Sequence, residues 1–207
     1  RQIAPVDEVE TVADAVAGAD VVVLSIPFAA IPGLGQILRD APASTVIVEM
    51  SNYYPEAGVI EGVAEAASDT TWLSEQVGRP IIKAWNSIFS RSLALKGRAA
   101  GEPDRVALPV AGDDLEDKKV VMQLVEETGF EAVDAGNLAD SWRMQPGSPV
   151  YCTDLDATAL RAALARADKT RMAHDRPTQI QAVYSPETGI DMVNGVEIYR
   201  EVTNQTR

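Results

Sequence analysis

The sequence predicts a doubly wound α/β fold with a mostly parallel sheet and a C-terminal β-hairpin extension. Two observations lead to this prediction. Short apolar runs rich in β-branched residues alternate with amphipathic segments along the first 167 residues. The first run, residues 19–27, is apolar on both faces, which is typical of a parallel strand covered by helices on both sides.

Five strands are predicted in this part of the chain. They cover residues 19–27, 45–48, 81–85, 106–111 and 131–134. Polar or glycine residues follow the second, third and fourth runs, which is where parallel strands end and turns begin.

Helical periodicity separates these runs. The predicted helices cover residues 6–17, 29–38, 115–128, 137–142 and 154–167. The segment 115–128 has the clearest apolar stripe, with Asp114 as its N-cap and Gly129 as its stop. Residues 53–70 are rich in glycine and alanine, and fit either a loop or a loose helix.

The chain divides into a domain over residues 1–167 and an extension over residues 168–207. In the extension, residues 179–184 and 196–199 are predicted as two strands with turn residues between them. An exposed hairpin arm can pair with a partner chain, which would suit a homodimer. A hairpin folded onto its own domain explains the same pattern equally well.

Composition excludes several classes of function. The net charge is -13 and the pI about 4.5, so the surface repels nucleic acid. No apolar run reaches the roughly 20 residues that cross a bilayer, and no signal peptide is recognisable. Membrane association is therefore not expected. The single cysteine, Cys152, cannot form an internal disulfide, which favours a cytoplasmic protein.

The candidate binding site lies at the strand ends, because ligands of open α/β sheets bind beyond the carboxyl ends of the strands. Hydroxyl and amide side chains there suit ribose hydroxyls and a carboxamide. The candidate residues are Ser25, Ile26, Pro27, Phe28, Ser51, Asn52, Ala84, Trp85 and Asn86. The alternative is that serine and asparagine end these strands because they form turns.

Other motifs carry less information. Gly33 and Gly35 do not complete a dinucleotide-binding glycine motif, and close helix packing explains them better. His174 lies in a polar segment without partners at metal-ligand spacing, so we expect an exposed residue and no metal site. Cys152 is interpreted as a buried structural thiol.

Five strand-end segments in register resemble the deazaflavin (coenzyme F-420)-dependent NADP oxidoreductase family. They cover residues 19–28, 51–55, 83–88, 108–114 and 129–136. Residues 141–151 resemble the bacterial NADP-binding reductases of that family. The resemblance extends over about residues 1–160 and does not reach the segment after Ala167.

The resemblance implies a Rossmann-type domain that binds NADP, with residues 25–28 towards its ribose and pyrophosphate. It places Asn52 and residues 84–86 towards the nicotinamide, and it implies hydride transfer to a deazaflavin, a flavin or another small acceptor. Because such transfer mainly requires two rings held face to face, no catalytic residue is assigned. The family's first strand, glycine loop and second strand have no counterpart in these residues, so we expect the native protein to carry them before Arg1.

Two functions of different classes follow. The first is an NADP-dependent oxidoreductase with a small-molecule substrate. The second is a non-catalytic nucleotide-binding or assembly module that keeps the fold, lacks the phosphate loop and binds a partner through its C-terminal extension.

Overall fold

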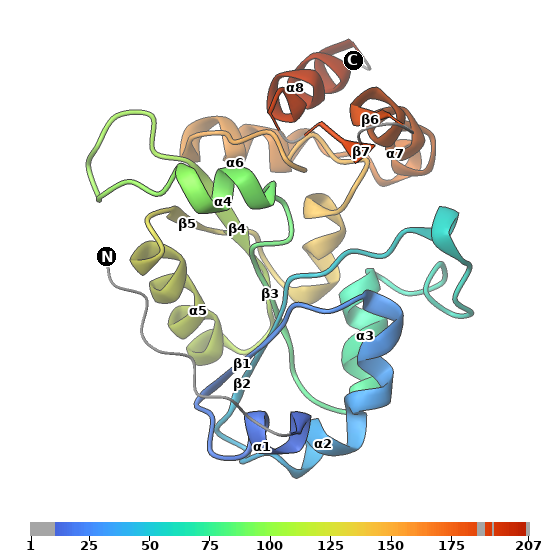
Figure 1. Cartoon of the computed structure of the whole chain (residues 1–207), viewed down its shortest axis with the longest axis vertical. Helices are drawn as coiled ribbons and strands as arrows, with labels where there is room; N and C mark the ends of the chain where they lie inside the picture. The colour runs from blue at the N-terminus through green and yellow to red at the C-terminus, as the bar shows by residue number, and fades with distance from the viewer. Residues whose placement is uncertain (1–10, 186–188, 192, 206–207) are drawn as a thin grey trace.

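The computed structural model describes residues 11–185, 189–191 and 193–205, and these form an open, mostly parallel α/β domain (Figure 1). Strands β1 (Val21–Leu24), β2 (Val46–Glu49) and β3 (Ile82–Lys83) form one parallel sheet in that order. Strands β4 (Ala107–Val110) and β5 (Glu131–Asp134) form a second parallel pair. The predicted doubly wound fold class is therefore confirmed.

An antiparallel bridge joins the two strand groups. The backbone N–H of Lys83 donates to the carbonyl of Ala111 at 2.8 Å, and the N–H of Ala111 donates back at 3.0 Å. Strand β3 is thereby tied to the end of β4. The backbone N–H and C=O groups of Lys83 and Ala111 thus satisfy each other, because buried backbone polar groups need hydrogen-bond partners.

The helices follow the strands in alternation. They are α1 (Val12–Val16), η1 (Phe28–Leu34), α2 (Gly35–Asp40), η2 (Pro55–Ala57), α3 (Asp69–Val77), α4 (Ser90–Leu95), α5 (Leu115–Glu127), η3 (Leu138–Met144), α6 (Ala157–Arg166), α7 (Lys169–Val183) and α8 (Gly195–Gln205). None of the helices within the described residues combines the length and apolar character needed to cross a lipid bilayer.

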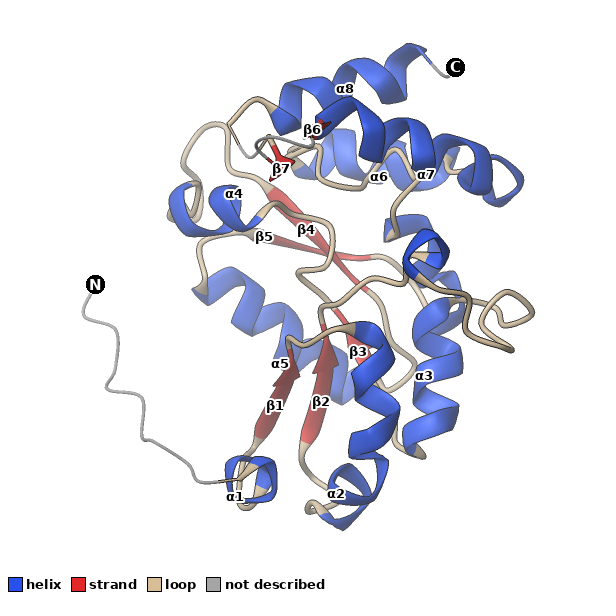
Figure 2. Cartoon of the chain, turned by 45° about the vertical axis from the view of Figure 1, so that its right-hand side comes forward, coloured by secondary structure: helices blue, strands red, loops and turns tan. Residues whose placement is uncertain are grey.

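Helices cover the three-stranded sheet on opposite sides, with α5 on one and η1, α2 and α3 on the other (Figure 2). Side chains of β1 and β2 alternate between these layers, as strand geometry dictates. Leu24 and Ile47 pack towards Ile31 and Leu73, whereas Val48 lies in the cluster that contains Val121. Close packing explains Gly35, where a Cβ would lie 3.4 Å from the Val77 Cα of α3, but not Gly33, where a Cβ would have no neighbour within 4 Å.

Strand β1 is less buried than its sequence predicts. It lies at the edge of the described sheet, and Val23 is 47% exposed. All four residues of β2 are buried because that strand has a neighbour on each side. The apolar pattern of residues 19–27 correctly predicts a strand. Whether that strand lies at the edge of the sheet depends on which other strands pair with it, and the pattern does not contain this information.

Helix α3 was not predicted by the sequence analysis. It begins after Ser68, whose hydroxyl accepts a hydrogen bond from the Thr71 N–H at 3.1 Å. It ends at Gly78, whose φ of 70° is the left-handed conformation of a helix stop. Both signals are in the sequence, but the glycine- and alanine-rich stretch before them obscures the start of the helix.

The two predicted C-terminal strands are wrong. Residues 179–184 lie mostly in α7, and residues 196–199 lie in α8. The hairpin is much shorter and pairs only β6 (Tyr184–Ser185) with β7 (Gly189–Ile190). The first half of the predicted helix 6–17 lies outside the described residues, and the second half corresponds to α1.

Helix α5 begins at the predicted cap. The Asp114 carboxylate accepts hydrogen bonds from the N–H groups of Glu116 and Asp117, at 2.9 and 3.0 Å. We expect Asp114→Ala to lower the free energy of unfolding by about 1 kcal/mol, measured by urea denaturation. Asp114→Asn keeps an accepting oxygen and should stay within about 0.5 kcal/mol of the parent. Equal losses in both variants would contradict the capping role.

Candidate functional site

A cavity of about 470 Å³ opens at the carboxyl ends of β1 and β2. It is lined by Pro27, Phe28, Ala29, Ser51, Asn52, Tyr53, Tyr54, Ala57, Gly58, Val59 and Ile60. None of these lining residues carries a charge. Its position matches the ligand crevice of open α/β sheets, and its volume is within the range of small-molecule sites.

Phe28 lines one wall of the cavity. It follows Pro27 at the start of η1 and is 5% exposed. Its ring stacks on Trp72 of α3 with centroids 5.8 Å apart and meets the Tyr53 ring at 5.5 Å. These contacts fix the ring that faces the cavity, and they connect the site directly to the core beneath η1.

Two asparagine amides pair at the ends of β2 and β3. The side-chain N–H of Asn86 donates to Asn52 Oδ1 at 3.0 Å and to the Met144 carbonyl at 2.8 Å. The Asn52 amide donates to the Asn86 carbonyl at 3.0 Å. Asn86 is buried, and its Oδ1 has no hydrogen-bond donor among the described residues. Asn52 is thus held in one orientation at the cavity wall.

A buried ion network lies next to this pair. The Lys83 ammonium contacts Glu49 Oε2 at 2.7 Å and Asp69 Oδ1 at 3.3 Å, with all three side chains at most 3% exposed. It also donates to the Ser51 carbonyl at 3.0 Å. Burial lowers the pKa of Lys83, but the two carboxylates outweigh burial and the pKa is raised. The network therefore holds the backbone from which Ser51 and Asn52 extend.

Tyr53 and Tyr54 begin the segment that forms the outer wall. The Tyr53 hydroxyl accepts a hydrogen bond from the Ile60 N–H at 2.9 Å, which closes the loop between them. The Tyr54 hydroxyl lies 2.6 Å from the Tyr151 hydroxyl. Burial raises the pKa of Tyr54 to about 12 although that hydrogen bond acts in the opposite direction. The phenol pair is therefore neutral at physiological pH.

The structure brings four of the nine predicted residues to the cavity: Pro27, Phe28, Ser51 and Asn52. Asn86 and Ala84 are buried behind it, and Ser25 and Ile26 are exposed beside it. Trp85 lies elsewhere, in an apolar hollow of about 720 Å³ that also contains Val23 and Leu124. The indole N–H of Trp85 donates to the Thr128 hydroxyl at 3.4 Å.

The outer wall of the cavity lies outside the nine predicted residues. Ala29 and residues 53–54 and 57–60 line it. Two adjacent tyrosines directly after Asn52 were a usable signal, because aromatic side chains are common in ligand pockets. The exposed Val59, by contrast, carries no sequence signal of its own, and only its place in the loop brings it to the site.

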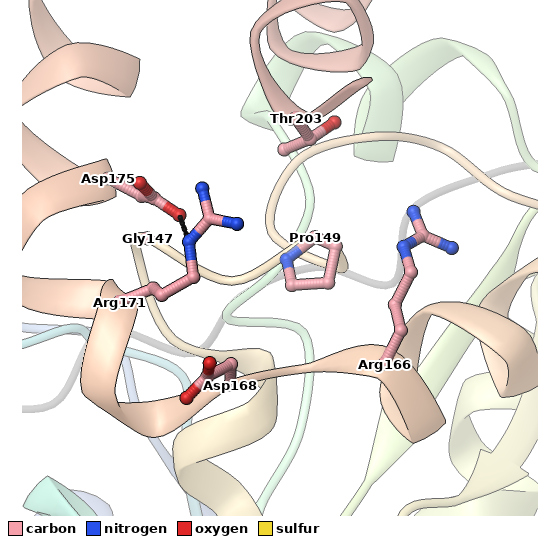
Figure 3. A pocket seen from close by; sticks show the side chains of 7 residues that line it. All are labelled: Gly147, Pro149, Arg166, Asp168, Arg171, Asp175 and Thr203. Atoms are coloured by element: carbon pink, nitrogen blue, oxygen red, sulfur yellow. Dashed lines mark ion pairs between the residues drawn. The ribbon is translucent and has the colours of Figure 1, made fainter. Parts of the chain in front are cut away.

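A charged hollow of about 170 Å³ lies apart from the strand ends, among residues 147–203 (Figure 3). Arg166 and Arg171 face it together with Asp168 and Asp175, and Arg171 pairs with Asp175 at 3.5 Å. The two charge signs balance, so the hollow has no clear ligand preference. In the described part of the chain, no three histidine, cysteine or acidic side chains are arranged to hold a metal.

Two predictions about single residues are confirmed. The His174 side chain is 83% exposed, and its Nδ1 lies 3.0 Å from a carboxylate oxygen of its neighbour Asp175. Cys152 is buried, and burial raises the pKa of its thiol well above the ordinary value. A thiol in this state is a poor nucleophile, so Cys152 contributes packing and not chemistry.

Comparison with known proteins identifies a partial relative and two similar structures. No protein-family model matches the chain. "Putative protein YjhV" of Escherichia coli (strain K12) is 44% identical over 69 residues, which are 33% of this chain and 50% of that protein. The matched region thus spans half the length of that curated relative.

Among solved structures, the hypothetical protein SMa0349 from Sinorhizobium meliloti is 26% identical, with a TM-score of 0.55 over 67% of each chain. A putative F420-dependent NADP-reductase from Arthrobacter sp. FB24 is 23% identical, with a TM-score of 0.49 over 63% of this chain and 61% of that one. The first likeness supports the α/β fold, and the second is too distant to carry an argument about function.

Proposed function

We propose that the chain is the nucleotide-binding part of an NADP-dependent oxidoreductase, which transfers a hydride between NADP(H) and a deazaflavin, a flavin or another small acceptor. One observation carries the proposal. An uncharged, aromatic-walled cavity lies at the carboxyl ends of β1 and β2, beside an oriented asparagine pair. A flat heteroaromatic ring with a carboxamide fits these features better than a phosphate does.

The residues present fit the nicotinamide part of the cofactor. Phe28 and Tyr53 offer ring faces, and Asn52 offers an amide that is already oriented by Asn86. The unpartnered Oδ1 of Asn86 lies buried behind the cavity, where a bridging water would satisfy it. Bound NADPH would supply a hydride. The protein's own contribution is to orient the ring and exclude water from it.

A direct titration tests the proposal. NADPH is added to the protein and binding is followed by the fluorescence of the reduced nicotinamide, with calorimetry as a second readout. Saturable binding is the expected result. The absence of binding at millimolar NADPH, with the protein shown to be folded by circular dichroism, would overturn the proposal.

A cavity-filling variant locates the binding. Ala29 is exposed at the cavity wall, so Ala29→Trp should fill the space without disturbing the core. We expect it to weaken NADPH binding by at least tenfold, or about 1.4 kcal/mol. Ala30→Trp is the matched control, because Ala30 is also exposed but does not line the cavity. Equal NADPH affinities in the two variants would place the cofactor elsewhere.

The acceptor requires a separate measurement. Mixing the protein with NADPH and an oxidised deazaflavin should bleach the deazaflavin absorbance if that ring accepts the hydride. Bleaching of a flavin alone would assign the acceptor to that class. No transfer to either, with NADPH bound, would favour another small acceptor.

One observation favours the second candidate, a non-catalytic assembly module. The apolar hollow around Val23 and Leu124 lies beside β1 at the edge of the described sheet. Uncovered strand edges and apolar hollows are typical of surfaces that bind another polypeptide segment. The NADPH titration separates the oxidoreductase from a pure assembly module, which does not require cofactor binding. The hydride-transfer measurement separates it from a non-catalytic nucleotide-binding module, which would bind NADPH without passing on a hydride.

A further inference from the structure

The wall of the candidate cavity is attached to the C-terminal extension. The segment after β2 runs on the side of the molecule opposite α5, between α3 and α7 (Figure 1). Three contacts join it to residues after 150. The Tyr54 and Tyr151 hydroxyls lie 2.6 Å apart, Arg176 Nε donates to Glu56 at 3.0 and 3.2 Å, and Lys169 Nζ donates to the Ala67 carbonyl at 2.6 Å.

Two of these contacts come from α7 and reach opposite ends of the segment. Arg176 holds its start at Glu56, and Lys169 holds its end at Ala67. The Arg176 side chain is 17% exposed and that of Glu56 is 42% exposed, so the ion pair is partly screened by solvent and its contribution is modest. Between the two attachments, Gly58 has a φ of 149° and Val59 is 85% exposed. Residues 57–59 are exposed, whereas Ile60 is held by the Tyr53 hydroxyl and packs against the core.

Helix α7 is itself firmly fixed to the domain. Gln179 is 1% exposed, and its side chain accepts from the Gly147 N–H at 2.7 Å and donates to the Ser148 carbonyl at 3.1 Å. Gly147 has a φ of 97°, and a Cβ there would lie 2.6 Å from the Met172 carbonyl oxygen. This close backbone approach leaves α7 little freedom to move relative to the 147–148 turn.

We propose that Arg176 of α7 is a positioning residue for the candidate site, which holds residues 56–63 in the arrangement that forms the ligand-binding wall. The identity of the ligand in this inference rests on the proposed function. The positioning role would mean that the C-terminal extension contributes to ligand binding. Ligand affinity falls when this wall is released, because only the fraction of molecules with an ordered wall then binds.

The experiment compares two arginine-to-methionine variants of α7. Arg176→Met removes the contact with Glu56. Arg171→Met is the matched control, because it removes the same charge from the same helix but breaks only a pair with Asp175 within α7 (Figure 3). We expect Arg176→Met to raise the Kd for NADPH threefold to tenfold (roughly 0.7–1.4 kcal/mol). Arg171→Met should leave it within twofold, and the urea midpoints of the two should agree.

A charge-swapped double variant, Arg176→Glu with Glu56→Arg, tests the pair itself. It should restore NADPH affinity to within about twofold of the parent, whereas each single change should weaken it. Restoration is not expected if Arg176 merely stabilises α7. Failure of the double variant to recover affinity, or equal Kd values for the two methionine variants, would overturn the proposal.

Amide hydrogen exchange tests the positioning role of Arg176 without any ligand, and therefore does not depend on NADPH binding. In the ligand-free protein, amide exchange in residues 56–63 should be several-fold faster in Arg176→Met than in Arg171→Met. Unchanged exchange would overturn the positioning role. Faster exchange without NADPH binding by the parent would support that role and reject only the proposed function.

Discussion

Replacing Lys83 with methionine is expected to lower the free energy of unfolding by about 3–5 kcal/mol, because two buried carboxylates would lose the ammonium that pairs with both of them. Lys83 and Glu49 are fully buried, and Asp69 is 3% exposed at its side chain. Urea denaturation at neutral pH measures the loss. The exposed pair of Lys119 and Glu116 provides the control, since Lys119→Met should change stability by no more than about 0.5 kcal/mol.

The Lys83 contribution also has a defined pH dependence. Its pKa is raised in the folded protein, so the charged form is favoured by folding. The stabilisation is fully present below the unfolded pKa of about 10.4 and is lost as the pH rises through the higher folded value. The stability difference between the parent and Lys83→Met should therefore be constant near neutral pH and narrow above about pH 10.4. A loss below about 1 kcal/mol at neutral pH would contradict the role of the network.

Phe28→Ala is expected to lower the free energy of unfolding by about 3–5 kcal/mol and also to weaken ligand binding. The ring is 5% exposed and packs on Trp72 and Tyr53, so its removal leaves a cavity below the candidate site. Phe28→Leu keeps most of the volume and should cost less than about 1.5 kcal/mol. Denaturation gives the stability, and NADPH titration under folded conditions gives the affinity.

Phe130→Ala is the matched control for the second effect. Phe130 is fully buried in the cluster beside α5, away from the cavity, and its truncation should cost a similar amount of stability. Both variants should unfold earlier, but only Phe28→Ala should raise the Kd for NADPH in the folded protein. A similar rise in both would mean that Phe28 acts through general stability and not as part of the site.

Local sequence patterns predicted most elements of the domain. Strand β5 occupies the predicted residues 131–134, and α5 has the predicted cap at Asp114. These predictions succeeded because the side-chain periods of strands and helices are properties of neighbouring residues. The same reasoning predicts polar residues at strand ends, and two of them, Ser51 and Asn52, line the cavity.

The C-terminal extension shows where local patterns were misinterpreted. Met172, Asp175, Gln179 and Val183 are buried at helical spacing on α7, and Val196, Tyr199 and Thr203 are buried likewise on α8. The β-branched and aromatic residues in these segments suggested strands, but β-propensity is weak and depends on packing. The buried positions have helical spacing, but three of them are polar (Asp175, Gln179 and Thr203), so the apolar pattern alone does not show the helices.

Neighbouring residues encode strands, helices and turns, so the α/β class, the strand ends and four of the residues that line the cavity follow from local sequence. The way these strand ends are joined into a site depends on tertiary contacts. Asn52 meets an asparagine 34 residues away, and Tyr54 meets a tyrosine 97 residues away. Lys83 is buried between carboxylates from β2 and α3, and α7 supports the outer wall. Such contacts join residues that are far apart in the chain, so no local pattern records them.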